Sequence, residues 1–265
     1  MLLKRVLVAA IFVPVLFLFI RWGGIPFLCL MSAIIGIALV EFYRGRDSTG
    51  MKLLSREGVM LGILLPISVY LGGAQVLPLV LVFIILFISL RQLFKFRVEA
   101  SSTSVFLTLG GIFYISFLLS HVVMLRAIPG LGEKLVLTAF FVTWMGDSGA
   151  YFIGIVGGKH KLFPRISPKK SLEGFIGGIL VSCLAIFISR FWLFLPFLHS
   201  VILGVLIGVM GQLGDFFESM LKREMKRKDF SSILPGHGGV LDRFDSLLFT
   251  TPVFYYYLKY LIIGA

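Results

Sequence analysis

Charged residues are scarce in this chain of 265 residues. Asp, Glu, Lys and Arg make up 14% of the sequence, whereas hydrophobic residues make up 58% and the mean hydropathy is +1.01. A typical soluble domain carries about 25% charged residues. The composition therefore excludes an ordinary soluble domain and indicates an integral membrane protein.

Cysteine and the common nucleotide-binding motifs are also scarce or missing. The two cysteines, Cys29 and Cys183, fall inside apolar runs without a Cys-x-x-Cys spacing, so we expect packed thiols rather than a disulfide or a thiolate metal site. The sequence has no Gly-x4-Gly-Lys-Ser/Thr, no Rossmann glycine pattern and no His-Glu-x-x-His. A bound nucleotide would therefore need a site of a different kind at the membrane face.

Long apolar runs are abundant. Nine of them approach the ~20 residues that cross a bilayer as a helix, and they cover roughly 6–20, 25–43, 58–72, 75–90, 104–125, 134–156, 174–195, 197–221 and 244–263. Only Gly72–Gln75 separates the third run from the fourth, which predicts a tight hairpin or a re-entrant pair. Lys4 and Arg5 precede the first run as in a secretory signal, but no A-x-A-type cleavage site follows, so we expect a retained first helix.

The basic residues are distributed unevenly between the loops. With the N-terminus inside, 20 of the 25 Lys and Arg residues fall at the N-terminus and in the even-numbered, cytoplasmic loops. This distribution predicts about nine transmembrane helices with the N-terminus in and the C-terminus out. The fold class we predict is a single all-α polytopic membrane domain over residues 1–265, with an N-terminal helical part at 1–130 and a catalytic half at 131–265.

The net charge of +12 needs no nucleic acid to explain it. Most of it follows the positive-inside bias, with anionic lipid headgroups as counterions. The remainder is concentrated beside glycines and carboxylates in the sixth and eighth loops. We therefore expect membrane lipids as partners and no nucleic acid.

Acidic residues inside apolar runs are candidates for function, because a buried charge is costly in lipid. Glu41 lies near the end of the second run, where an interfacial position is expected. Asp147 has apolar sequence on both sides, and helical spacing places it on one face with the residues Thr143, Tyr151, Gly154 and Gly158. The alternative for Asp147 is a hydrogen bond to a neighbouring helix with no role in chemistry.

The eighth run carries a stripe at three- and four-residue steps. It consists of Gly204, Gly208, Gly211, Asp215, Glu218 with Ser219, and Lys222. Its glycines permit close approach of another helix, as small-xxx-small patterns do in membranes. Asp215 is the member of the stripe for which packing gives no explanation.

Two further carboxylates follow Gly239. If a helix starts near Leu241, Asp242 and Asp245 are three residues apart and share a face, while Arg243 points elsewhere. Such a pair suits an oxygen-preferring cation such as Mg²⁺. The alternative is a surface pair of Asp242 with Arg243, and Asp245 as a helix-start residue.

The sixth loop offers a second polar cluster. We expect Ser167 to cap the next helix with Pro168 at its first position, so that the free N–H groups, Lys169 and Lys170 form an anion site. A solvated basic loop is the alternative. In the eighth loop, His237 stands between Gly236 and Gly238, and it suits a general acid or base, a phosphate ligand or a turn residue equally.

The segment from Ser219 to Asp245, which we call the signature segment, resembles the signature of phosphatidate cytidylyltransferases (CDP-diacylglycerol synthases). The matching positions are Ser219-x-Leu221-Lys222-Arg223, Lys228-Asp229-x-Ser231, Leu234-Pro235-x-His237-Gly238-Gly239-Val240 and Asp242-Arg243-Phe244-Asp245. Asp147–Tyr151 and Ser167–Gly174 are similar to other shared blocks of that family, although many members have Thr-Trp where this chain has Ser171-Leu172. The short N-terminus is more typical of a bacterial member.

The resemblance implies a Mg²⁺-dependent nucleotidyltransferase of phospholipid biosynthesis, which makes CDP-diacylglycerol and diphosphate from CTP and phosphatidate in the cytoplasmic membrane. It implies metal ligation of one or two cations by Asp147, Asp215 and Asp242. The catalytic residues it implies are Asp215, Asp242, Asp245, Lys222, Arg223 and His237. The substrate-binding residues are Lys169, Lys170, Ser171, Lys228, Asp229, Gly238, Gly239 and Arg243. A homodimer is compatible with a glycine-rich membrane domain.

Two other classes are alternatives. In an ion- or proton-coupled transporter, Asp147 and Asp215 would form a relay, but this does not explain the glycine-histidine loop or the one-sided basic density. Another polytopic phosphotransferase, of the CDP-alcohol type, also uses membrane-face aspartates. Its Asp-Gly-x2-Ala-Arg block is absent from this sequence.

Overall fold

The structure, a computed structural model, describes residues 2–48, 50, 52–95, 101–234, 236 and 238–263. Within these ranges the chain is helical, and the β-type pairing consists of two isolated bridges, Lys161 with Ser171 and Leu234 with Gly238. A helix satisfies its own backbone groups, which lipid cannot do, so apolar runs of this length become helices. The predicted all-α fold is confirmed.

The chain forms two compact units. The first consists of Met1–Ala127 with Met225–Arg243, and the second of Ile128–Glu224 with Phe244–Ala265. The signature segment therefore contributes to both units.

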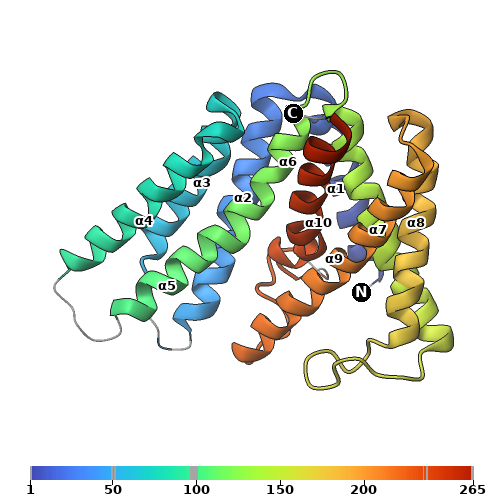
Figure 1. The fold of residues 1–265 in the computed structure, drawn as a ribbon. Helices are drawn as coiled ribbons and strands as arrows, with labels where there is room; N and C mark the ends of the chain where they lie inside the picture. The colour runs from blue at the N-terminus through green and yellow to red at the C-terminus, as the bar shows by residue number, and fades with distance from the viewer. Residues whose placement is uncertain are drawn as a thin grey trace. The chain divides into compact units, whose positions relative to one another are not determined.

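The first unit contains six α-helices and three short helical segments within the described residues (Figure 1). They are α1 (Leu2–Trp22), α2 (Gly24–Asp47), α3 (Ser55–Gly72), η1 (Ala74–Val76), α4 (Leu77–Leu93), α5 (Ser101–Gly111), the π-helical η2 (Ile112–Phe117), α6 (Leu118–Arg126) and η3 (Leu241–Arg243). Helix α2 packs against α3, and its buried Tyr43 donates a hydrogen bond of 2.7 Å to the carbonyl oxygen of Thr108. The two runs separated by Gly72–Gln75 form a helical hairpin of α3 and α4, in which Gly73 turns the chain at φ +72°.

The second unit contains four α-helices and a final π-helical segment within the described residues. They are α7 (Gly132–Gly157), α8 (Leu172–Leu193), α9 (Phe197–Glu224), α10 (Asp245–Tyr257) and η4 (Leu258–Ile263). Helix α8 packs against both α7 and α9, and α9 packs against α10. A Cβ atom at Gly204 would lie 2.6 Å from the Cα of Cys183, and one at Gly208 would lie 2.8 Å from the Cα of Ile179. The predicted close approach at the glycine stripe is confirmed.

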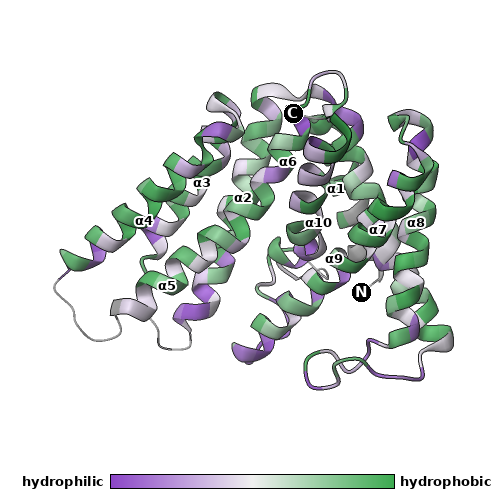
Figure 2. Cartoon of the chain, viewed as in Figure 1, coloured by the Kyte–Doolittle hydropathy of each residue, from purple (hydrophilic) through white to green (hydrophobic). Residues whose placement is uncertain are grey.

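Six helical stretches in the described residues are long and apolar enough to cross a membrane. They are Gly24–Asp47, Ala74–Leu93, Ser102–Arg126, Gly132–Gly157, Leu172–Leu193 and Phe197–Glu224, and Ala10–Trp22 is a shorter apolar helix. Hydrophobic residues cover most of α4 and α8, whereas hydrophilic residues gather in the segment that joins α7 to α8 (Figure 2). The protein is therefore a polytopic membrane protein, and each of the nine predicted runs coincides with helical structure.

Both cysteines are free thiols, as the spacing predicts. Cys183 is half-buried, but the side chain of Cys29 is exposed on α2. The expectation of a packed thiol is therefore wrong for Cys29. An apolar run shows that a residue is in the membrane, but it does not show which face of the helix is covered by protein.

Candidate functional site

Helix α9 gathers charged side chains near its C-terminal end. Asp215, Glu218 and Lys222 follow one another at intervals of three and four residues, so they share a face of the helix. The ammonium Nζ of Lys222 lies 2.7 Å from Oε2 of Glu218, whose side chain has no exposed surface. The predicted stripe thus ends in a buried ion pair beside Asp215.

Helix α10 adds a third carboxylate to this face. Ligand oxygens of Asp215, Glu218 and Asp245 all lie within 4.8 Å of one another. The close approach depends on Gly214, because a Cβ atom there would lie 2.7 Å from the carbonyl oxygen of Asp245. We call Asp215, Glu218 and Asp245 the acidic cluster. Sequence analysis missed Glu218 as a ligand, although its place three residues after Asp215 was the available signal.

Helix α7 brings Asp147 to the same unit. Oδ1 of Asp147 accepts a hydrogen bond of 3.1 Å from the hydroxyl of Ser246, the residue after Asp245. One turn earlier, the hydroxyl of Thr143 lies 3.2 Å from that of Thr250 on α10. This hydroxyl pair links α7 to α10 and thereby fixes the position of Asp147 along α10. Ser246 carried no signal in the sequence, because its partner is 99 residues away.

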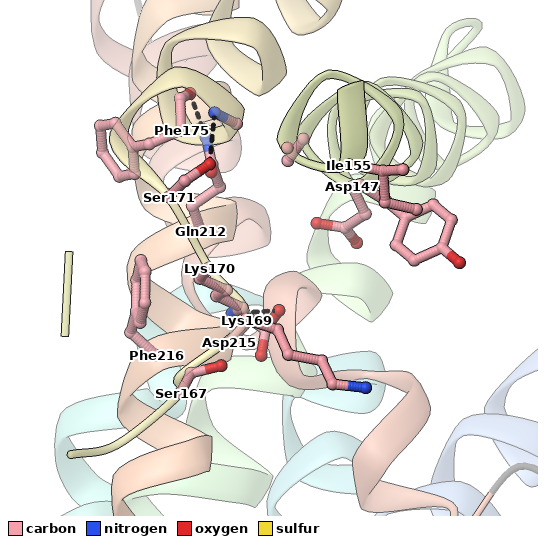
Figure 3. Close-up of a pocket in the computed structure, with 14 residues that line it drawn as sticks. Asp147, Ile155, Ser167, Lys169, Lys170, Ser171, Phe175, Gln212, Asp215 and Phe216 are labelled. Atoms are coloured by element: carbon pink, nitrogen blue, oxygen red, sulfur yellow. Dashed lines mark hydrogen bonds and ion pairs between the residues drawn. The ribbon is translucent and has the colours of Figure 1, made fainter. Parts of the chain in front are cut away.

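A pocket of about 490 Å³ lies within the second unit, and Asp147 and Asp215 are on its wall. Asp147, Tyr151 and Gly154 of α7 line it, as the predicted helical face requires, and Gly174 and Phe175 of α8 and Gln212 and Asp215 of α9 also line it. Figure 3 shows the Asp147 carboxylate directed into the pocket from α7. Gln212, another residue that sequence analysis missed, donates a hydrogen bond of 2.7 Å to the carbonyl oxygen of Phe175.

Lys170 places a positive charge beside Asp215 in the pocket. Its Nζ lies 2.5 Å from Oδ2 of Asp215 and 4.2 Å from the centroid of the Phe216 ring (Figure 3). Side chains of Lys170 and Asp215 are 29% and 30% exposed, so both remain accessible from the pocket. Lys169 and Ser167 also line the pocket. The structure therefore brings the predicted residues Asp147, Lys169, Lys170, Ser171 and Asp215 together.

The start of α8 differs from the expectation. Ser171, in an extended conformation, is the N-cap, and its Oγ accepts a 3.2 Å hydrogen bond from the N–H of Gly174. Ser167 instead lies in a turn, where its N–H donates to Phe163 and its carbonyl oxygen accepts from Lys170. The prediction of an N-cap at Ser167 is therefore wrong, because Ser171 reaches an unpaired helical N–H and Ser167 does not.

Two contacts fix the segment between α7 and α8. Glu173 accepts hydrogen bonds from the N–H groups of Lys159 and His160, and its Oε1 lies 2.6 Å from Nδ1 of His160. Nε of Arg223 donates a hydrogen bond of 3.1 Å to the carbonyl oxygen of Ile166. Arg223 thus holds the segment that carries Lys169 and Lys170.

The donor set of the second unit fits a hard divalent cation. Carboxylate oxygens are the ligands that Mg²⁺ prefers, and the acidic cluster offers three such groups. Among Asp147, the acidic cluster, Lys170 and Lys222, two lysines pair with two of four acids. Two negative formal charges remain, which one divalent cation would neutralise.

The remaining predicted residues of the signature segment lie in the first unit. Oδ2 of Asp242 accepts hydrogen bonds from the N–H groups of Phe230, at 3.0 Å, and Gly239, at 2.7 Å. Lys228, Asp229 and Arg243 are exposed, and Gly238 adopts φ +87° beside the Asp229 side chain. His237, like Pro235, lies outside the described residues.

The helix expected from Leu241 starts later. Residues Leu241–Arg243 form a 3₁₀ turn, and α10 begins at Asp245 after Phe244, whose φ of −117° and ψ of 3° are not helical. The prediction that Asp242 and Asp245 share a helical face is therefore wrong. The non-helical backbone of Phe244 separates the two aspartates, and carboxylates bind the N–H groups of Gly239 and Leu241 ahead of it.

This site defines a class of protein: a polytopic membrane enzyme with carboxylates and lysines that suit the transfer of a phosphate-bearing group. Residues 3–261 match the model of the cytidylyltransferase family, and the chain belongs to this family. Over 97% of each chain, it is 35% identical to the phosphatidate cytidylyltransferase of Bacillus subtilis (strain 168). It is 45% identical to the phosphatidate cytidylyltransferases of Staphylococcus haemolyticus (strain JCSC1435) and Staphylococcus aureus (strain COL), over 46% of this chain and 48% of each relative.

Proposed function

We propose that this chain is a phosphatidate cytidylyltransferase, which converts CTP and phosphatidate to CDP-diacylglycerol and diphosphate. The observation that carries the proposal is the similarity to the Bacillus subtilis enzyme along nearly the whole length of both chains. The acidic cluster and the lysines of the pocket are consistent with this reaction. A transporter is not favoured, because the matched family is named for cytidylyl transfer.

The reaction joins two polyanions. A phosphate oxygen of phosphatidate attacks the α-phosphorus of CTP, a new P–O bond forms, and the bond from the α-phosphorus to the bridging oxygen breaks, which releases diphosphate. The attacking oxygen already carries negative charge near neutral pH, so no strong general base is required. Positioning of the two phosphates and stabilisation of the charge on the leaving diphosphate then account for most of the catalysis.

The residues of the pocket suit these tasks. Lys170 is exposed toward the pocket, and we propose that it exchanges its contact with Asp215 for the nucleotide phosphates. Lys169 lines the same pocket and would add to the positive charge. Lys222 would compensate Glu218 within the buried part of the cluster, and Arg223 would hold the segment that bears both lysines.

Asp215, Glu218 and Asp245 would hold a Mg²⁺ ion, with Asp147 close to it. When bound, the ion would neutralise phosphate charge and orient the two reacting groups. Asp242 as a further ligand and a second cation remain predictions from the sequence. The catalytic role of His237 and the substrate contacts of Lys228, Asp229, Gly238, Gly239 and Arg243 also remain predictions.

We further propose nine transmembrane helices in the cytoplasmic membrane, with the N-terminus and the active site on the cytoplasmic side, where CTP is found. The distribution of basic residues supports this orientation. Phosphatidate would enter sideways with its acyl chains in lipid, past Tyr151 and Ile155, which are each 64% exposed beside the pocket. We assign the chemistry to the C-terminal half and regard a homodimer as compatible with this scheme.

The proposal is tested with purified protein, radiolabelled CTP, phosphatidate and Mg²⁺. We expect a lipid-soluble cytidine product from the wild-type protein and a loss of about 100-fold or more in rate for Asp215→Ala, because the variant lacks a cluster carboxylate and the partner of Lys170. Glu133→Ala, in the first turn of α7, is the matched control and should keep the wild-type rate. Absence of product from the wild-type protein would refute the function, and a wild-type rate for Asp215→Ala would refute the assignment of the acidic cluster.

A further inference from the structure

Glu41 of α2 is buried, although its place near the end of an apolar run predicts an interfacial position. Glu41 is 2% exposed, and the neighbouring residues Leu39 and Phe42 of the same helix are buried as well. A carboxylate withdrawn from water in this way is unstable unless hydrogen bonds replace those of the solvent. The hydrogen-bond donors around Glu41 therefore show how an acid is accommodated at this position.

Three donors surround the Glu41 carboxylate. Oε1 accepts hydrogen bonds of 2.6 Å from the hydroxyl of Ser231 and 2.9 Å from the N–H of Val240, and Oε2 accepts one of 2.8 Å from the N–H of Leu241. All three donors belong to the signature segment, about 190 to 200 residues further along the chain. Hydrogen bonds to an ionised acceptor are stronger than neutral ones, so Glu41 holds two parts of this segment together.

Asp242 completes the arrangement from within the segment. Its Oδ2 joins the N–H of Phe230 to the N–H of Gly239, so each carboxylate bridges one stretch at 230–231 and another at 239–241. Space for Glu41 depends on Gly239, because a Cβ atom there would lie 2.6 Å from Oε2 of Glu41. The glycine thus has a packing role beside the carboxylate, and its N–H points to Asp242 rather than to a ligand.

We propose that Glu41 is a positioning residue of the cytidylyltransferase reaction, an inference that rests on the function proposed above. Glu41 is bonded to the segment that carries Lys228, for which the family resemblance implies a contact with the triphosphate, and Asp229, for which it implies substrate binding. It does not act on the substrate itself. It fixes the conformation of the segment that bears these exposed side chains, and we expect its loss to affect the use of CTP more than the use of phosphatidate.

The test compares Glu41→Gln, Ser231→Ala and the double variant with the wild-type protein, in steady-state assays against CTP and against phosphatidate. Gln keeps the size of Glu41 but loses its charge and presents an amide to the N–H of Leu241. We expect kcat/KM for CTP to fall about 10- to 100-fold in Glu41→Gln, with KM for phosphatidate unchanged. Ser231→Ala removes one donor and should cause a smaller loss in the same parameter.

The double variant separates a specific contact from general damage. If Ser231 acts through Glu41, the double variant should be no worse than Glu41→Gln, whereas independent effects would add. Asp47→Asn is the matched control: Asp47 ends the same helix and accepts hydrogen bonds from Leu53, just before α3, and from Ser55, the first residue of α3. The control should keep wild-type kinetics for both substrates.

Hydrogen exchange of the protein in nanodiscs gives a readout that does not require activity. Amides of Val240 and Leu241 should exchange faster in Glu41→Gln and remain protected in Asp47→Asn. Wild-type kinetics in Glu41→Gln, additive losses in the double variant, or an equal loss toward both substrates would each overturn the proposal. If Glu41→Gln does not fold, unchanged CTP kinetics in Ser231→Ala overturn it. A wild-type protein without cytidylyl transfer would instead refute the proposed function, and exchange at these amides would still report whether Glu41 holds the segment.

Discussion

At Glu218, a carboxylate without exposed surface lies between one cation, Lys222, and two further acids, Asp215 and Asp245. Like charges at such distances repel each other strongly in a medium of low dielectric constant. Lys222 offsets part of this repulsion, and a bound divalent cation would offset the rest. We therefore expect Glu218 to determine how strongly the cluster binds a cation.

Glu218→Gln should raise the Mg²⁺ concentration for half-maximal activity on the order of 10- to 100-fold, because one of the three negative charges is lost while the shape is kept. The measurement is a Mg²⁺ titration of the transfer rate at saturating substrates. Part of the rate should return at high Mg²⁺ in this variant, and Glu133→Gln should titrate like the wild-type protein. The same half-saturation concentration in Glu218→Gln would contradict a ligand role.

Residues of the candidate site were predictable from the sequence only where a charged residue stood out against the apolar composition of a membrane protein. Asp147, Asp215 and Lys170 were found because charge is rare in the apolar runs and clusters in one loop. Ser246 and Gln212 were not found, and Glu41 was expected only at the interface, since their partners are 99, 37 and up to 200 residues away in sequence. The N-cap at Ser171 rather than Ser167 was decided by turns that no local pattern distinguishes.

At the scale of elements, the second unit depends on close contacts between helix backbones. Gly204 and Gly208 of α9 face Cα atoms of α8, and Gly214 faces the backbone of α10 at Asp245. Helix association in lipid relies on this kind of close packing, because lipid is as apolar as the side chains. The glycines therefore determine where the acidic cluster lies relative to α7 and α10.

Gly208→Ala should lower the stability of the protein by about 1 to 3 kcal/mol, because the new methyl group would lie 2.8 Å from the Cα of Ile179 and α8 would have to move. The measurement is Tm in detergent. Gly157→Ala is the matched control, since a Cβ atom at this helical position meets nothing within 4 Å and alanine favours a helix. An equal Tm for Gly208→Ala and the control would show that the glycine stripe does not hold α8 and α9 together.

Elements were easier to predict than their ends. Each of the nine apolar runs coincides with helical structure, the form in which an apolar segment can satisfy its own backbone in lipid. The start of α10 at Asp245 rather than near Leu241 was not predictable, because the non-helical backbone of Phe244 (φ −117°, ψ 3°) interrupts the helix and no local sequence pattern signals it. The π-helical segments at Ile112–Phe117 and Leu258–Ile263 were not predictable either, because their hydropathy does not differ from that of an α-helix.

At the scale of the whole molecule, charge asymmetry and chemistry coincide. The segment between α7 and α8 carries five basic residues, Lys159, Lys161, Arg165, Lys169 and Lys170, and two of them line the pocket. Positive charge in a short loop favours its retention on the cytoplasmic side during insertion, which is the orientation we propose. The same charge would attract a nucleoside triphosphate, so the topology and the binding of substrate favour the same side of the membrane.

The proposed orientation predicts opposite accessibility for the two ends of α7. Pro129→Cys and Lys159→Cys, each introduced singly after Cys29 and Cys183 are replaced by alanine, place an exposed thiol at either end of this helix. In spheroplasts of an expressing bacterium, a membrane-impermeant maleimide should label Pro129→Cys directly and Lys159→Cys only after permeabilisation. Each variant should also retain cytidylyl transfer, which verifies its fold. Labelling of Lys159→Cys in intact spheroplasts would place the basic segment outside, away from CTP, and the proposed orientation would then be wrong even if the reaction is correct.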